Sequence, residues 1–145
     1  MRHGNFGKKL SRTKNERRGL FRNLLRELIA HDAIVTTKTK AQAIRGQVDK
    51  LITKAKQESE WSKRQLFAVL TDRQAVAKLV ADASTRFAKR NSGYTRMVKL
   101  GARVGDSTEM VKLMFVDEQT ALVAVKEPEV AKKSIKEGKQ EKDQK

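Results

Sequence analysis

The sequence predicts an α+β domain of two layers, in which helices pack on one face of a small three-stranded sheet. Two observations predict this class. Apolar residues recur at helical spacing in four segments, and three short strand-like runs lie between and after those segments. The predicted order is α-β-α-α-α-β-β. With 145 residues, of which 38% are hydrophobic, the chain can build one modest core and carries charged extensions.

The first predicted helix begins at Thr13, whose spacing to Glu16 is that of a capping box. Its apolar stripe runs from Leu20 to Ile29, and we expect the helix to end near His31 and Asp32. Residues 34–37 follow as a β-branched run, which favours a strand.

Three more helices are predicted before the hairpin. Capping-box spacing places the start of the second at Thr39, with Gln42, and the second helix runs to about residue 56. The third covers residues 59–70. The fourth begins at Thr71, whose spacing to Gln74 is that of a capping box, and it ends in the turn at residues 89–93.

Three aromatic residues in these helical segments, Trp61, Phe67 and Phe87, lie at core spacing. We therefore expect them to pack in the core rather than to stack on bases. The low aromatic content of 5% also argues against a base-stacking sheet.

Residues 94–100 and 110–116 form two strand-like runs joined by a turn-rich segment, and they predict a long-looped hairpin that the strand at 34–37 joins. The chain thus divides into a basic extended arm (1–12), an α+β domain (13–116) and a charged C-terminal extension (117–145). Within that extension, residues 121–125 fit either a strand or a helical turn, and periodicity does not decide between them.

Positive charge is concentrated in two clusters. Of the formal net charge of +16, half lies in the first 26 residues, which hold nine Lys or Arg against one acidic residue. A second cluster, residues 86–103, holds six cations and no acid. If the strand at 94–100 pairs beside the strand at 34–37, both clusters lie on one side. Such charge predicts a polyanionic partner, because neutralising phosphates releases condensed counterions.

The composition also argues against several classes of function. The chain has no cysteine and only two histidines, His3 and His31, so we predict no disulfide and no metal site. It contains no apolar run of membrane length, no phosphate loop and no dinucleotide fingerprint. We therefore predict no cofactor, no small-molecule substrate, no membrane partner and no catalysis. A DNA-binding protein and an RNA-modifying enzyme are the alternatives.

Several sequence blocks resemble the bacterial large-subunit ribosomal protein family L seventeen. They span residues 1 to about 116 and include MRH at the start, GKKLSR at 7–12, LIAHDAIVTT at 28–37 and GYTRMVKLGARVGD at 93–106. The resemblance implies a structural rRNA-binding protein of the cytoplasmic ribosome. It also implies a position near the rim of the polypeptide exit tunnel, next to other large-subunit proteins. Contacts mainly to phosphates and sugars are expected.

The predicted RNA-contacting residues lie in the arm, the first helix, the strand–helix junction at residues 37–38 and the hairpin region. The resemblance itself implies contacts from the arm, from the arginines of the first helix and from the hairpin. The full predicted set is Arg2, His3, Lys8, Lys9, Arg12, Lys14, Arg17, Arg18, Arg22, Thr37, Lys38, Arg90, Tyr94, Arg96, Lys99 and Arg103.

Overall fold

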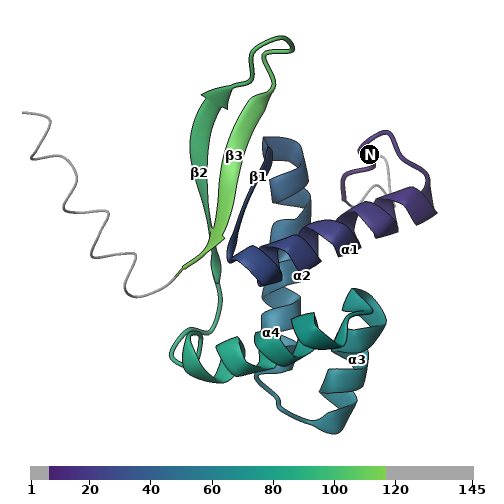
Figure 1. The fold of residues 1–145 in the computed structure, drawn as a ribbon, viewed down its shortest axis with the longest axis vertical. Coiled ribbons are helices and arrows are strands. Elements are labelled where there is room, and N and C mark those ends of the chain that lie inside the picture. The colour runs from purple at the N-terminus through teal and green to yellow at the C-terminus, as the bar shows by residue number, and fades with distance from the viewer. Residues whose placement is uncertain (1–6, 117–145) are drawn as a thin grey trace, which may run out of the picture. The chain divides into compact units, whose positions relative to one another are not determined.

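The computed structural model describes residues 7–116, which fold into four helices and a three-stranded antiparallel sheet (Figure 1). The predicted α+β class and element order are confirmed. Arg2 and His3 of the predicted arm, and the predicted extension 117–145, lie outside the described residues. The elements are α1 (Lys14–His31), β1 (Ala33–Thr37), α2 (Lys38–Ala55), α3 (Glu60–Leu70), α4 (Arg73–Thr85), β2 (Thr95–Ala102) and β3 (Glu109–Phe115).

The central strand of the sheet is β3, and the strand order is β1-β3-β2. Val111, Leu113 and Phe115 alternate along β3 as buried residues, so this strand has the most apolar inner face and takes the centre. The strand β1 joins the hairpin as predicted, but it pairs with β3 and not with β2. The premise that placed both cationic clusters on one side is therefore wrong. Figure 1 shows β2 at the sheet edge away from α1.

The core lies where the helices meet one face of the sheet. Helix α2 contacts all three strands, while α1 and α4 cross α2 (Figure 1). Phe87 is fully buried, as predicted, with its ring edge-on to Tyr94 and Phe115 at centroid distances of 5.3 and 5.4 Å. The largest fully buried apolar side chains are Leu25, Leu28, Ile44, Ile52, Leu66, Leu70, Leu79, Phe87, Tyr94 and Leu113.

The predicted burial of the other two aromatic residues is wrong. Trp61 is 66% exposed and Phe67 is 43% exposed. The buried stripe of α3 instead consists of Ser62, Leu66 and Leu70, one residue per turn. A helix of this length buries a single stripe, so aromatic residues at neighbouring positions stay on the surface.

The start of α1 follows the predicted capping box. The Thr13 amide donates to Glu16 Oε2 at 3.0 Å, and the Glu16 amide donates to Thr13 Oγ1 at 3.5 Å. The hydrogen bond from the Thr13 amide lowers the pKa of the Glu16 carboxyl. The helix ends at His31, and Asp32 closes it in the left-handed conformation with φ of 61°.

The other two predicted capping boxes are wrong because the connections are shorter than expected. The strand β1 passes directly into α2, so Thr37 is both the end of the strand and the N-cap, and Thr39 lies inside the helix. Thr71 is the C-cap of α3, which leaves Asp72 as the N-cap of α4. The Gln74 amide donates to Asp72 Oδ1 at 2.9 Å.

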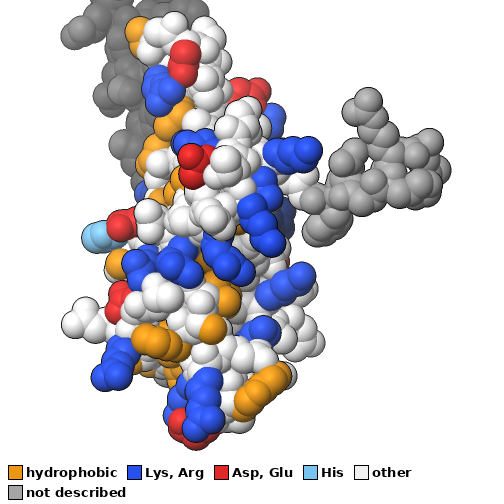
Figure 2. Space-filling view, turned by 90° about the vertical axis from the view of Figure 1, so that its right-hand side faces the viewer, with side chains coloured by type: hydrophobic (Ala, Val, Ile, Leu, Met, Phe, Trp, Pro, Cys, Tyr) orange, Lys and Arg blue, Asp and Glu red, His pale blue; other side chains and the backbone are white. Residues whose placement is uncertain are grey.

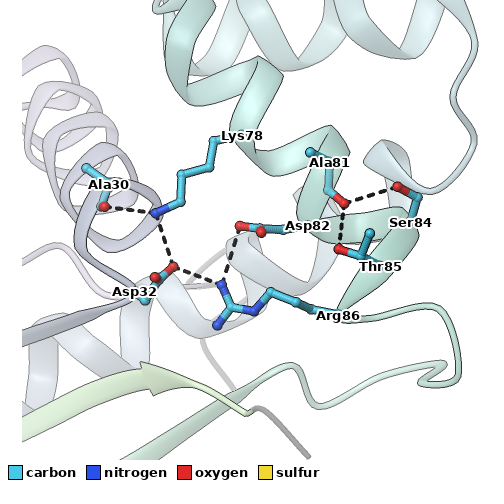
Figure 3. A network of polar contacts seen from close by, with 8 residues as sticks. All are labelled: Ala30, Asp32, Lys78, Ala81, Asp82, Ser84, Thr85 and Arg86. Atoms are coloured by element: carbon cyan, nitrogen blue, oxygen red, sulfur yellow. Dashed lines mark hydrogen bonds and ion pairs between the residues drawn. The ribbon is translucent and has the colours of Figure 1, made fainter.

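The helix α4 ends at Thr85, earlier than the predicted turn at residues 89–93. The Ser84 and Thr85 hydroxyls donate back to the Ala81 carbonyl at 3.0 and 2.8 Å. Figure 3 shows these two bonds. Hydroxyls that bond to the preceding turn compete with helix continuation. Gly93 does adopt a positive φ of 69°, but in the turn before β2.

Candidate nucleic-acid interface

The first half of α1 forms one wall of a groove rich in positive charge, here called the cationic groove. Its volume is about 400 Å³, and it lies between α1, α2 and the C-terminal end of α3. Its lining residues include four cations and no acid. Figure 2 shows a band of Lys and Arg side chains at the level of α1. The lining residues are Lys14, Arg17, Arg18, Phe21, Arg22, Leu25, Gln47, Ala68 and Val69.

Helical spacing explains why these cations gather. Residues three or four positions apart lie on the same helix face, so Lys14, Arg18 and Arg22 follow one another along the groove. The capping box at Thr13 fixes where the helix begins and hence which way these side chains point. Four predicted RNA-contacting residues of α1, the fourth being Arg17, are therefore brought together by the fold.

The described part of the predicted arm, residues 7–12, forms a turn and is not extended. The Arg12 amide donates to the Lys9 carbonyl at 3.3 Å. Arg17 Nη1 approaches the Lys9 and Arg12 carbonyls at 3.5 and 3.4 Å, and Lys8 Nζ donates to Gln42 Oε1 of α2. These contacts hold Lys8, Lys9 and Arg12, all exposed, next to the N-terminus of α1.

Two α1 arginines serve the fold by capping the C-terminus of α3. Arg22 Nε donates to the Val69 carbonyl at 3.1 Å, and Arg26 Nε donates to the Leu70 carbonyl at 2.6 Å. Arg26 also donates to Thr71 Oγ1. The last carbonyls of a helix lack intrahelical partners, and a cation there also interacts well with the helix dipole. The predicted contact residue Arg22 thus has a structural partner as well.

Tyr94, also predicted to contact RNA, is a core residue whose side chain offers almost no exposed surface. It is 1% exposed, and its hydroxyl donates to the Arg90 and Asn91 carbonyls at 3.3 and 3.1 Å. The predicted contact residue Arg90 also offers its carbonyl to Lys56 Nζ. The tyrosine therefore fixes the turn that leads into β2.

The remaining predicted residues lie around the sheet. Lys38 forms an ion pair with Glu109 of β3, and that contact lowers the pKa of the glutamate. The Thr37 hydroxyl lies 3.3 Å from the Thr39 hydroxyl. The side chains of Arg96 and Lys99 are exposed on β2 and form no ion pair with another described residue.

Arg103 lies in the hairpin loop and is locally neutralised. Its Nε donates to Asp106 Oδ1 at 3.1 Å, and its Nη2 bonds the other carboxylate oxygen at 2.5 Å. These hydrogen bonds hold the pKa of Asp106 well below its usual range. Within the second cationic cluster, Arg96 and Lys99 are therefore better placed than Arg103 to meet a polyanion.

Arg86, also from the second cluster, belongs to an ion-pair network with Asp32 (Figure 3). Arg86 Nη1 lies 3.0 Å from Asp32 Oδ1 and 3.5 Å from Asp82 Oδ2. Burial acts to raise the pKa of Asp32, but the hydrogen bonds from Arg86 and Lys78 outweigh it and lower that pKa. Burial raises the pKa of Asp82.

Lys78 completes this network by capping the C-terminus of α1. Its Nζ donates to the Ala30 carbonyl at 2.9 Å and lies 3.3 Å from Asp32 Oδ1. Its partners lie far away in the chain, and no local pattern signals them.

Within residues 7–116, no group of three or more His, Cys, Asp or Glu side chains could hold a metal ion. None of the helices described there is long and apolar enough to cross a membrane.

The chain matches one protein family over most of its length. A family model described as Ribosomal protein L17 covers residues 20–116. The chain is 39% identical over 139 residues to the large ribosomal subunit protein bL17 of Amoebophilus asiaticus (strain 5a2), covering 96% of this chain and 72% of that relative. It is also 39% identical over 119 residues to the bL17 protein of Desulforapulum autotrophicum, covering 82% and 99%. The chain therefore belongs to the ribosomal protein L17 family.

Proposed function

We propose that this protein is a structural, non-catalytic component of the large ribosomal subunit that binds folded large-subunit rRNA through phosphate and sugar oxygens. Membership of the family supports the role in the subunit, because both relatives described above are named large-subunit proteins. The cationic groove supports the RNA contacts. It places four cations together with no acid among its lining residues, and the described residues of the arm add three more beside it.

The groove is suited to phosphates rather than to bases. Its charges are carried mainly by arginine, which binds phosphate oxygens through two parallel hydrogen bonds. Its single aromatic ring, Phe21, is partly buried and leaves no platform on which bases could stack. Contacts of this kind position a protein on a folded RNA and carry little sequence information.

The proposal also includes a place in the cytoplasmic ribosome near the rim of the polypeptide exit tunnel, in contact with neighbouring large-subunit proteins. The position near the tunnel rim is supported by the resemblance of the sequence blocks to the family. The names of the relatives support a place in the large subunit.

The test compares two pairs of cations that are spaced alike on two helices. Lys14→Gln with Arg18→Gln removes two cations of the groove, and Lys50→Gln with Lys54→Gln removes two from α2 that do not line it. Binding to transcribed large-subunit rRNA is measured at several salt concentrations. We expect the first pair to lower the salt slope by about two and the affinity by roughly tenfold or more. The second pair should change the affinity by less than about twofold.

Two results would contradict the proposal. One is equal loss of affinity in both pairs of variants, because the groove would then carry no special contact. The other is preferential binding of duplex DNA in competition with the rRNA, which would favour the DNA-binding alternative.

A further inference from the structure

We propose that a second groove, between α3 and α4, is the docking site for an amphipathic protein helix that carries carboxylates along its edges. This groove, here called the apolar groove, has a volume of about 790 Å³. Its floor is apolar and its rim is charged. The floor consists of Phe67, Val76, Ala77 and Val80, and the rim consists of Glu60, Lys63, Arg64 and Arg73.

The floor exposes apolar surface that the domain does not use. Phe67 is 43% exposed, although a buried aromatic side chain would stabilise the fold by about 2 kcal/mol. Trp61, on the same helix, is 66% exposed. Figure 2 shows hydrophobic side chains between charged ones at the end of the domain formed by α3 and α4. A concave apolar surface with charges at its margin has the form of a binding site.

The charged residues at the rim indicate which charge the partner carries. Glu60 and Lys63 form an ion pair at 2.7 Å across one helical turn, so these two charges compensate each other. Arg64 and Arg73 line the same groove, are exposed and form no ion pair with another described residue. The unpaired charge at the rim is therefore positive, and carboxylates on the partner would complement it.

The composition of the groove favours protein over RNA. Three of the four floor residues are aliphatic and offer no ring for a base to stack on. Two cations at this rim, Arg64 and Arg73, form no ion pair with another described residue, whereas four cations and no acid line the cationic groove. A cleft between two helices accepts the apolar stripe of a third, with its side chains at positions i, i+3, i+4 and i+7.

The test uses a synthetic helical peptide of about 18 residues, with leucines on one stripe and glutamates beside it. Its two controls are a scrambled peptide of the same composition and a peptide with lysines in place of the glutamates. Binding to the full chain is followed by peptide fluorescence anisotropy. Emission from Trp61, the chain's one tryptophan, reports coverage of α3. We expect saturable binding of the acidic peptide alone.

Variants assign that binding to the groove. Phe67→Ala, and separately Arg64→Glu with Arg73→Glu, should each weaken peptide binding by roughly tenfold. Arg18→Glu, in the cationic groove, should leave it unchanged, so a failure here is distinguishable from a failure of RNA binding. All these side chains are exposed, and thermal unfolding checks that the variants fold.

Three outcomes would overturn the proposal: no saturable binding, equal binding of the scrambled peptide, or unchanged affinity in both groove variants. Displacement of the peptide by rRNA from wild-type chain and Arg18→Glu alike would assign the groove to RNA and would also overturn it.

Discussion

The cationic groove and the apolar groove share helix α3, yet their linings differ and we propose different partners for them. In the first, four cations converge and no acid lines the surface. In the second, cations border an apolar floor and one of them is paired with Glu60. The formal charge of +16 does not distinguish these surfaces. On these two proposals, the neighbours of a cation, more than its charge, decide which partner it suits.

The same comparison separates cations that serve the fold from cations that remain available. Arg26 and Lys78 cap the ends of α3 and α1, and Arg103 is paired with Asp106. Lys14 and Arg18 line the cationic groove and form no ion pair with another described residue. The charge that we propose to bind RNA is therefore a subset of the total charge.

The largest expected effect comes from reversing one charge in the cationic groove, and the same reversal in the apolar groove is its control. Arg18→Glu should weaken rRNA binding by about 10- to 100-fold, because it removes a phosphate contact and adds a repelling carboxylate. Arg64→Glu makes the same change in the apolar groove, and rRNA affinity should stay within about twofold of wild type. Filter binding at a fixed salt concentration measures both. Comparable losses in the two variants would remove the distinction between the grooves.

Removal of residues 2–12 tests whether the arm belongs with the cationic groove. Incorporation into large subunits should fall several-fold. The melting temperature should fall by less than about 5 °C, since the described contacts of the arm are a few exposed hydrogen bonds. Incorporation is measured by competition with wild-type chain, and melting by circular dichroism. Normal incorporation of the shortened chain would show that the arm adds no RNA contact.

A smaller effect separates Arg26 from the groove cations. Arg26→Ala should lower the free energy of unfolding by about 2 kcal/mol, because it removes the charged donor to the Leu70 carbonyl. Arg18→Ala should change it by less than about 0.5 kcal/mol. Urea unfolding measures both values. Equal stability of the two variants would mean that Arg26 does not act as a cap.

The smallest expected effect is the contribution of Asp32, which depends on pH. Asp32→Asn keeps a residue that tolerates the left-handed conformation but removes the charge facing Arg86 and Lys78. Because this carboxylate is partly exposed and screened, the loss at pH 7 should be about 1 kcal/mol. The folded-state pKa of Asp32 is lowered, so its contribution is present above the unfolded pKa and is lost as pH falls through the folded value.

Urea unfolding of wild type and Asp32→Asn at pH 7 and at pH 3 checks this sign. The difference in free energy should be smaller at pH 3, below the ordinary aspartate pKa of about 3.9. A difference that grows at acid pH would contradict the account of the network.

Local patterns predicted the element order and the start of α1, because the bonds between Thr13 and Glu16 join neighbours in sequence. They failed where one residue serves two elements. Thr37 ends β1 and caps α2, and Thr71 ends α3, which shifts the next cap to Asp72. Where the end of one element and the start of the next fall on neighbouring residues, spacing alone does not tell which residue is the N-cap.

The positive charge of the candidate site could be predicted from the sequence. Which of its residues are exposed, and which are buried or cap helix ends, could not. Lys14, Arg17 and Arg18 gather as the helical spacing implies. The burial of Tyr94 and the capping by Arg22 and Lys78 depend on partners brought close by tertiary packing. The exposure of Phe67 was also missed, because apolar spacing does not tell which stripe of a short helix meets the core.

The most direct test of the cationic groove uses two alanines, Ala68 in the cationic groove and Ala77 in the apolar groove, both of them exposed. A photoreactive amino acid at either position leaves every groove charge in place. After assembly into large subunits and irradiation, the crosslinked product is identified as RNA or protein. We predict that position 68 crosslinks to rRNA and position 77 to protein. Crosslinking of position 68 to protein alone would contradict the proposal that the cationic groove binds rRNA.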